Sequence, residues 1–227
     1  MRVDWNKYAK HYDNLNHLIA YQDLKKQILS NANKYLPEKV TNILDLGCGA
    51  GNITEGLVRD FEEAEIYALD SSSEMLNVAI SKIRSDKVIF KSFDINNITK
   101  FQPEVKYDLI VINNVLYTID DKYLLLELLS NKLSNNGIII LSDPIPKEEY
   151  SYLRILLKQL VSLKSAFKTL MLVPSLLYIY IINKKIDLAY SRLNRDQYIS
   201  LIKEKKLQIL NIEKSYSEQA NLFVIKK

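Results

Sequence analysis

The sequence predicts an α/β fold, with a doubly wound and mostly parallel sheet covered by helices on both faces. Short apolar runs alternate with helical patterns along residues 42–143, as expected of parallel strands joined by crossover helices. Four of the five glycines fall at positions 47–56, directly after the first apolar run. Two further apolar runs at the C-terminus are close enough in sequence to form an antiparallel pair.

Each expected element has its own signal. Residues 4–36 carry apolar side chains at helical spacing up to Pro37 and predict a helical N-terminal segment. The predicted strands that follow cover residues 42–47, 65–70, 88–94, 107–114 and 138–143. The predicted helices between them cover residues 52–61, 72–84 and 121–133, and a turn is expected at 134–137. A last helix at 194–207 precedes the strand pair at 208–215 and 221–227, which would complete a seven-stranded sheet.

The composition limits the class of protein. The 227 residues are 48% hydrophobic and 26% charged, which is typical of a globular chain, and we expect a single domain over residues 1–227. A net charge of +4 from charges of both signs is too weak to indicate a nucleic-acid partner. The one cysteine, Cys48, and an N-terminus without an apolar signal core predict a cytoplasmic protein that has no disulfide and no thiolate metal site.

The glycine cluster indicates a loop where the backbone turns tightly or approaches a ligand. In doubly wound folds, ligands bind beyond the carboxyl ends of the strands, where this loop would lie. A phosphate loop would need Gly-Lys-Ser/Thr, but Asn52 follows Gly51. A dinucleotide fingerprint would need a glycine at the sixth position counted from Gly47, which is again Asn52, so a nicotinamide-dependent oxidoreductase is disfavoured. What remains is the spacing Asp45-x-Gly47-x-Gly49-x-Gly51.

The segment ILDLGCGAGNIT at residues 43–54 resembles the first motif of class I S-adenosylmethionine-dependent methyltransferases. The stretches LDSSSEML, FKSFDINN and YDLIVINNVLYTI resemble the later motifs of this family, in the same order. The N-terminus, with Trp5, Ala9, Tyr12 and Asp13, is similar to the first helix of the small-molecule branch. The resemblance covers residues 1–143 and, in outline, the last thirty residues. It implies a Rossmann-like fold, S-adenosylmethionine as cofactor and a small-molecule acceptor.

The resemblance also implies roles for acids that end two strands. It places Asp70, nineteen residues after Gly51, on the ribose hydroxyls, and Asp94 beside the adenine amino group. Helix capping is the alternative role for Asp70, but a capping box formed by Ser71 and Glu74 would leave its carboxylate available. An ordinary turn is the alternative role for Asp94.

Other residues complete the expected cofactor site. Asn113 is implied to contact the methionine part of the cofactor, Asp45 is expected to order the glycine loop, and Tyr12 either reaches the cofactor or packs beneath it. The cofactor-binding residues that we expect are Tyr12, Asp45, Gly47, Cys48, Gly49, Asp70, Ser71, Met75, Asp94, Ile95 and Asn113. No residue is assigned a catalytic role, because in-line transfer from a sulfonium depends mainly on positioning and a dry site.

A helical insertion that would cover the site is expected at residues 144–193, where family members commonly carry a lid over the acceptor. The only charges between Tyr150 and Val173 are Arg154, Lys158, Lys164 and Lys168. They lie on one side of a helix and leave a wide apolar face. This pattern fits a buried lid helix, a lid that receives a hydrophobic acceptor, or a basic amphipathic helix on an anionic membrane. The uncharged run at 169–183 is too short to span a bilayer.

The sequence therefore predicts a methyltransferase that acts on the oxygen or nitrogen of a small and rather apolar acceptor. Two alternatives stay open, namely methylation of a lipid at a membrane surface and a catalytically silent scaffold that only binds the cofactor. The expected partner is the small-molecule acceptor, with peripheral contact to an anionic membrane as the open alternative and no nucleic acid.

Overall fold

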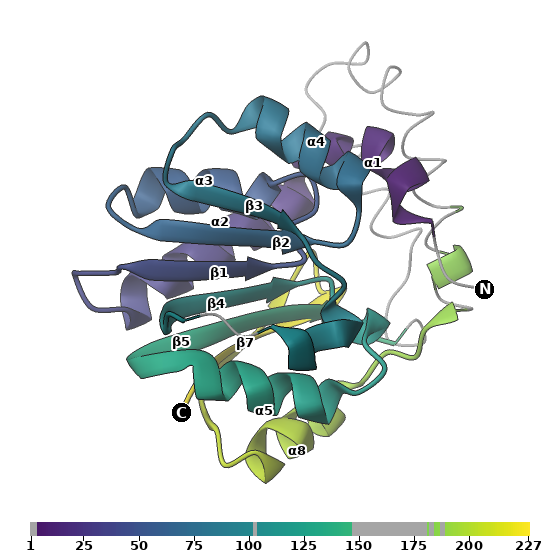
Figure 1. Cartoon of the computed structure of the whole chain (residues 1–227). Coiled ribbons are helices and arrows are strands. Elements are labelled where there is room, and N and C mark those ends of the chain that lie inside the picture. Colours follow the sequence, from purple (N-terminus) through teal and green to yellow (C-terminus); the bar gives the residue numbers. More distant parts are fainter. Residues whose placement is uncertain (1–3, 102–103, 147–180, 182–183, 187–188) are drawn as a thin grey trace.

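The computed structural model describes residues 4–101, 104–146, 181, 184–186 and 189–227. Most of the expected insertion, including every residue from Tyr150 to Val173, therefore lies outside the described residues. The described chain forms a seven-stranded sheet with helices on both faces (Figure 1). This architecture confirms the predicted fold class.

The strands follow the order β3-β2-β1-β4-β5-β7-β6 across the sheet. Neighbouring strands are parallel from β3 to β5, and β7 pairs antiparallel with both β5 and β6, as expected. The strands are β1 (Asn42–Leu46), β2 (Glu65–Asp70), β3 (Val88–Ser92), β4 (Tyr107–Asn113), β5 (Leu133–Pro144), β6 (Gln208–Ser215) and β7 (Ala220–Lys226). The chain reverses its winding direction between β1 and β4, so a switch point lies beside the glycine loop.

The helices lie close to their predicted positions, except at the N-terminus. They are α1 (Trp5–Tyr12), α2 (Ile19–Tyr35), α3 (Asn52–Asp60), α4 (Ser73–Lys82), α5 (Lys122–Lys132) and α8 (Arg195–Glu204). Short 3₁₀ helices are η1 (Asp13–His17), η2 (Ile95–Lys100) and η3 (Leu116–Thr118). The N-terminal helical segment is interrupted by η1 because the run DNLN favours local polar contacts, and Leu18 is extended.

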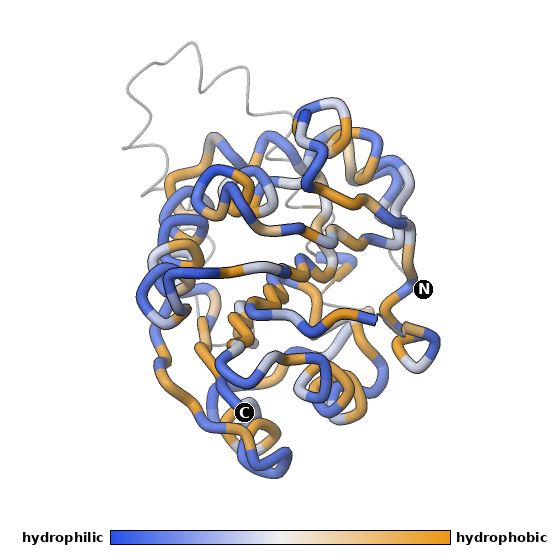
Figure 2. Tube along the Cα trace, turned by 60° about the vertical axis from the view of Figure 1, so that its left-hand side comes forward, coloured by the Kyte–Doolittle hydropathy of each residue, from blue (hydrophilic) through white to orange (hydrophobic). Residues whose placement is uncertain are grey.

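Alternating strand residues face two apolar layers. One layer contains Ile43, Ile66 and Val111 and packs against α2 and α3. The other contains Leu44, Ile110 and Ile139 and packs against α5 and α8, which lie together on the opposite face (Figure 1). The helices around the sheet alternate between hydrophobic and hydrophilic segments (Figure 2), as amphipathic helices covering a buried sheet do.

The predicted turn at residues 134–137 was wrong, because β5 already begins at Leu133. Tyr107 pairs with Leu133, but Leu109 pairs with Ile138, so the register shifts and β5 takes up extra residues opposite β4. Gly137 fits this irregular stretch because a Cβ there would lie 2.7 Å from the Tyr107 carbonyl oxygen. The Asn-Asn-Gly sequence indicates a turn locally, but pairing with β4 decides the structure.

Asp108 joins three segments at the amino end of the sheet. Its Oδ2 accepts hydrogen bonds from the backbone nitrogen of Thr41 at 2.8 Å and from Thr41 Oγ1 at 2.9 Å. Its Oδ1 accepts a hydrogen bond from Ser134 Oγ at 2.6 Å, across to β5. Burial alone would raise the pKa of the Asp108 carboxyl, but these hydrogen bonds outweigh it and lower that pKa below its usual value.

We expect Asp108→Asn to lower the free energy of unfolding at pH 7 by about 1–2 kcal/mol, the range for hydrogen bonds to a half-buried charged group. Because the native pKa is depressed, the carboxylate stabilises the fold above the unfolded-state pKa, and this contribution is lost as the pH falls through the native pKa. Urea unfolding of both proteins at pH 7 and near pH 3 measures the difference. Asp86→Asn, at an exposed carboxylate, is the control. A difference that stays constant with pH would contradict the assignment.

Candidate functional site

A pocket opens beyond the carboxyl ends of β1, β2 and β4, at the switch point of the sheet. Its walls come from the N-terminal helix, the loops after these strands, the segment before α8 and the β6–β7 turn. Of the expected cofactor-binding residues, those that line the pocket are Tyr12, Gly47, Gly49, Asp70, Ser71, Met75, Ile95 and Asn113. The structure therefore brings together residues that are spread over the first half of the sequence.

The glycine loop needs glycine for steric reasons. Gly47 and Gly49 have φ values of +75° and +54°, in the left-handed region that side chains disfavour. A Cβ on Gly47 would lie 2.2 Å from Val115 Cγ2, and one on Gly49 would lie 3.3 Å from Tyr12 Cε1. The nitrogens of Gly47 and Cys48 both donate hydrogen bonds to the Leu69 carbonyl oxygen, at 2.7 and 2.9 Å. The loop is thereby held against the end of β2, with its backbone bare toward the pocket.

Asp70 ends β2 at the pocket wall, and both of its carboxylate oxygens are held by backbone. Its Oδ2 accepts a hydrogen bond from the nitrogen of Gly49 at 2.9 Å, and its Oδ1 accepts one from the nitrogen of Ser72 at 2.8 Å. Burial raises the pKa of the Asp70 carboxyl, and these N–H groups oppose the rise. The carboxylate is fixed in position, with remaining lone pairs for a ligand.

The expected capping box of Ser71 and Glu74 was wrong. Ser72 caps α4 instead, because its Oγ accepts a hydrogen bond from the nitrogen of Met75 at 3.2 Å. Ser71 is exposed at the pocket lining, one residue before the cap. Asp70 is therefore not the N-cap residue of α4, although it also binds the Ser72 nitrogen.

Three expected residues do not line the pocket. Asp45 is 1% exposed and accepts a hydrogen bond from Thr54 Oγ1 at 2.6 Å, so it links β1 to the first turn of α3 as the sequence suggested. Burial raises the pKa of Asp45 to about 6. Cys48 packs against Ala68, and burial raises the pKa of its thiol. Asp94 caps η2 through the Asn96 nitrogen at 3.0 Å, the turn role named as its alternative. Their contact with a cofactor stays a prediction.

The end of β4 presents two asparagines to the pocket. Asn113 is 6% exposed, and its Oδ1 is buried without a hydrogen-bond partner among the described residues. Asn114 adopts a left-handed φ of 57°, and its nitrogen donates a hydrogen bond to the Ser142 carbonyl oxygen at 2.8 Å. A buried acceptor without a partner indicates that a donor from a ligand belongs beside Asn113.

Aromatic side chains form a continuous row, and Trp5, Tyr8, Tyr12 and Tyr216 of this row line the pocket. The ring centroids of Trp5 and Tyr8 are 5.9 Å apart, those of Tyr8 and Tyr12 are 5.4 Å apart, and Tyr12 contacts Tyr21 at 6.5 Å. Tyr21 in turn contacts Tyr216 of the β6–β7 turn at 6.2 Å. Burial is the main reason that the pKa of Tyr12 is raised to about 12. This row of contacts connects α1 to the β6–β7 turn near the C-terminus.

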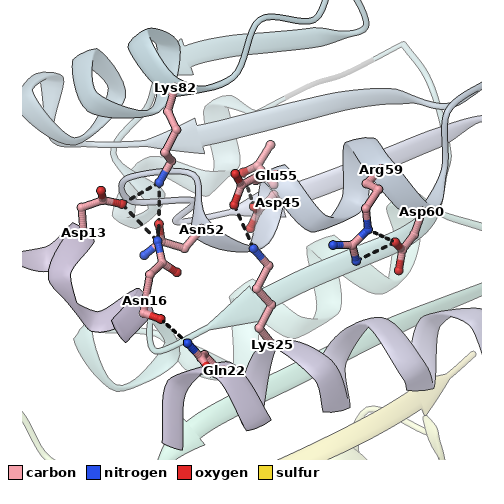
Figure 3. Close-up of polar contacts among 11 residues, drawn as sticks. Asp13, Asn16, Gln22, Lys25, Asp45, Asn52, Glu55, Arg59, Asp60 and Lys82 are labelled. Atoms are coloured by element: carbon pink, nitrogen blue, oxygen red, sulfur yellow. Dashed lines mark hydrogen bonds and ion pairs between the residues drawn. The ribbon is translucent and has the colours of Figure 1, made fainter. Parts of the chain in front are cut away.

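A polar cluster holds the N-terminal segment over the glycine loop (Figure 3). Lys82 Nζ on α4 lies 2.6 Å from Asp13 Oδ1 and donates a hydrogen bond to Asn52 Oδ1 at 2.6 Å. Asn16 Nδ2 donates to the same Asn52 oxygen at 2.6 Å. Lys82 thus connects the N-terminal segment, α4 and the first residue of α3. No local pattern in the sequence indicates this contact.

The far wall of the pocket contains residues that sequence reasoning missed. Arg192 lies with its guanidinium carbon 5.8 Å from the centre of the Tyr117 ring, and its Nη1 donates a hydrogen bond to the Ile145 carbonyl oxygen at 3.4 Å. Behind them Asp143 is completely buried at the end of β5 and accepts a hydrogen bond from Tyr198 Oη at 2.5 Å. Asp143 could have been identified from the sequence, because it lies at the end of a predicted strand, as Asp70 does.

The β6–β7 turn that completes this wall has a strained backbone. Tyr216, Ser217 and Glu218 have φ values of 51°, 52° and 71°, all in the left-handed region. The backbone of the turn is anchored because the Ile145 nitrogen donates to the Gln219 carbonyl oxygen at 2.9 Å. Strain of this kind persists where the surroundings fix it, commonly at functional sites.

The described part of the chain was also searched for a metal site and for a membrane-spanning helix. Within it, no group of His, Cys, Asp and Glu side chains is placed to hold a metal ion. Nor is any helix there long and apolar enough to cross a bilayer.

The fold and the pocket define a class I methyltransferase, the class that the sequence motifs resemble. The family model described as methyltransferase domain matches residues 37–214, and the chain belongs to this family. A crystal structure of an S-adenosylmethionine-dependent methyltransferase from Clostridium acetobutylicum has a TM-score of 0.64, covering 96% of this chain and 98% of that one. At 18% identity, this likeness shows the fold.

Two curated relatives are more similar in sequence but only in part. Malonyl-[acyl-carrier protein] O-methyltransferase 2 of Ilyobacter polytropus is 36% identical over 123 residues, which are 54% of this chain and 46% of that protein. Trans-aconitate 2-methyltransferase of Enterobacter sp. (strain 638) is 34% identical over 115 residues, 51% of this chain and 44% of that protein. The chain thus spans about half the length of the curated relatives it matches.

We expect Lys82→Met to loosen the N-terminal segment, because the substitution keeps the side-chain length but removes both polar contacts of the ammonium group. Amide hydrogen exchange in α1 and η1 should accelerate about fivefold, equivalent to about 1 kcal/mol of local opening free energy. The measurement is hydrogen exchange followed by mass spectrometry.

Lys25→Met is the matched control. Lys25 is 19% exposed against 21% for Lys82, and it lies 3.0 Å from Glu55, but it joins α2 to α3 rather than the N-terminal segment to α4. Equal acceleration in both variants would show that Lys82 does not hold this segment.

Proposed function

We propose that the chain binds S-adenosylmethionine in this pocket and transfers its methyl group to a small molecule. The observation that carries the proposal is the Asp70 carboxylate, held at the end of β2 by the nitrogens of Gly49 and Ser72 beside a bare glycine backbone. A carboxylate in this position can accept hydrogen bonds from two ribose hydroxyls. The glycine spacing does not suit phosphates, so a nucleoside without phosphates fits the loop better than a dinucleotide.

The described residues fit the other parts of this cofactor as well. The buried Oδ1 of Asn113 would accept a hydrogen bond from the ammonium group of the methionine part. Met75 and Ile95 supply apolar surface beside Asp70, where the adenine would lie. Asp45 and Cys48 would shape the loops around the cofactor, and Asp94 is still expected beside the adenine amino group.

Bound S-adenosylmethionine supplies an electrophilic methyl group on a sulfonium, and the chain has to orient the two reactants and exclude water. The aromatic row with Trp5, Tyr8 and Tyr12 covers the pocket with apolar surface whose ring faces also favour a cation. The raised pKa of Tyr12 keeps its hydroxyl protonated at neutral pH, so it can donate a hydrogen bond but does not act as a base.

The acceptor is inferred from the relatives and not from contacts in the pocket. The names of the two relatives describe methylation of a malonyl group on a carrier protein and of trans-aconitate, and both acceptors are small groups methylated outside nucleic acid. We infer a small-molecule acceptor here, with oxygen or nitrogen as the methylated atom. The apolar acceptor and the lipid alternative depend on residues 150–173, outside the described part of the chain. A silent scaffold is the remaining alternative, and incubation with methyl-labelled cofactor and a metabolite extract, followed by mass analysis, distinguishes it.

We expect the purified protein to bind S-adenosylmethionine and S-adenosylhomocysteine in calorimetric titration. NAD should bind at least about a hundredfold more weakly, because the glycine loop does not have the spacing that binds the phosphates of a dinucleotide. A heat response to NAD with none to either sulfur nucleoside would reject the proposed function.

Asp70→Ala should weaken binding of S-adenosylhomocysteine by about 1.5–3 kcal/mol, the range for hydrogen bonds to a charged group. The matched control is Asp121→Ala, which removes an acceptor for the Leu124 nitrogen at the start of α5, away from the pocket. Both variants should lose about 1 kcal/mol of stability, because each loses a carboxylate that accepts hydrogen bonds from backbone N–H groups. Equal cofactor affinity in the two variants would mean that Asp70 only orders the loops.

A further inference from the structure

Residues 4–17, which contain α1 and η1, supply one wall of the pocket. The side chains of this segment that line the pocket are Trp5, Tyr8, Tyr12 and Leu15. They recur every three or four positions, so one face of the segment is turned toward the pocket. The edge of the Tyr12 ring lies over the glycine loop, since a Cβ on Gly49 would be 3.3 Å from Tyr12 Cε1. A ligand bound at Asp70 and the glycine loop therefore lies beneath this face.

The segment is joined to α2 through a single extended residue, Leu18. Its φ of −84° and ψ of 128° separate the last turn of η1 from the first turn of α2. α2 itself is fixed against the sheet, because Leu24 and Ile28 are completely buried in the core. An extended residue between a fixed helix and a short terminal segment has the geometry of a hinge.

At its first end, the segment is held to the start of α4. Ser72 Oγ donates a hydrogen bond to Asn6 Oδ1 at 2.7 Å, and the Glu74 nitrogen donates to the same oxygen at 3.4 Å. Asn6 thus accepts from one of the N–H groups that the first turn of a helix leaves without a helical partner. The Ser72 nitrogen also donates to Asp70 Oδ1 at 2.8 Å. The residue that orients Asp70 therefore also holds α1.

At its other end, the segment is held to α4 and α3 (Figure 3). Lys82 Nζ, in the last turn of α4, lies 2.6 Å from Asp13 Oδ1, and Asn16 Nδ2 donates to Asn52 Oδ1 at 2.6 Å. Asn52 is the first residue of α3, directly after the glycine loop. The side chains of Lys82 and Asp13 are 21% and 44% exposed, so water can replace their contact when the segment moves away.

Burial of apolar side chains keeps the segment closed in the absence of a ligand. Tyr8 and Ala9 are 3% and 1% exposed, and both belong to the same core cluster as Leu24 of α2. Movement of the segment away from the pocket would expose them to water, which is unfavourable. The open arrangement is therefore a minor population, and a ligand that enters under this segment depends on that population.

We propose that residues 4–17 are a gate over the cofactor, hinged at Leu18, which opens for S-adenosylmethionine to enter and for S-adenosylhomocysteine to leave. The inference rests on the proposed function for the identity of the ligand, and it adds how that ligand is exchanged. Asn6 and Lys82 hold the gate but do not line the pocket, so they act on the gate and not on the ligand.

A gate of this kind has a kinetic signature. A contact that holds the gate equally in the free and the bound protein determines how often the gate opens, but not how tightly the ligand is bound. Its removal therefore raises the association and dissociation rate constants by the same factor and leaves the dissociation constant unchanged. Loss of a residue that contacts the ligand, or damage to the pocket, raises the dissociation rate constant without raising the association rate constant.

Stopped-flow fluorescence measures both rate constants for S-adenosylhomocysteine. Trp5 is the one tryptophan of the chain and lies on the gate beside the pocket, so its emission reports binding. Asn6→Ala and Lys82→Met should each raise both rate constants about fivefold. The double variant should raise them by about the product of the two factors, because the contacts lie at different ends of the gate. Lys25→Met removes an ion pair of similar exposure between α2 and α3, and as the control it should change neither rate constant.

The outcomes are distinguishable. Rate constants that stay at wild-type values in Asn6→Ala and Lys82→Met overturn the gate, as does a dissociation rate constant that rises while the association rate constant does not. An unchanged dissociation constant in the variants also shows that they are folded. Binding to the wild-type protein is checked by calorimetry, which does not depend on Trp5. Failure of S-adenosylhomocysteine to bind there overturns the proposed function, and with it the ligand of the gate.

Discussion

The pocket depends on the end of β2, which holds the glycine loop through both backbone and side chain. The Leu69 carbonyl oxygen accepts two hydrogen bonds from the loop, and the Asp70 carboxylate accepts a third from Gly49 while also binding Ser72. These contacts fix the ends of two strands and the start of α4 relative to one another. The left-handed φ of Gly47 makes them possible, since a side chain there would collide with Val115. A ligand therefore meets a preformed surface.

The sheet was predictable because its central strands are buried on both faces and form continuous apolar runs of strand length. The failures came where non-local contacts override local preference. Residues 134–137 have a turn sequence, but the shifted pairing of β5 with β4 and the Asp108–Ser134 bond extend the strand. The break at η1 differs, because the local run DNLN favours it, and Asp13 also pairs with Lys82, 69 residues away.

The site was predictable only where its residues follow one another at fixed spacing. The glycines and Asp70 lie in short motifs at strand ends, and the chain direction alone brings them to one edge. Arg192 and Tyr117 are 75 positions apart and carry no motif, so only the folded chain shows that they touch. Asp143 is an intermediate case, since its strand-end position was visible but its bond to Tyr198 was not.

The arrangement of strands separates two electrostatic requirements. A sulfonium cofactor is favoured by the carboxylates at the ends of β1 and β2, where Asp45 and Asp70 lie, whereas an anionic acceptor would be repelled there. Because β4 and β5 continue the sheet past the switch point, Arg192 can lie at the same edge without neutralising Asp70. The strand order that places the crevice thus also allows opposite charges on its two sides.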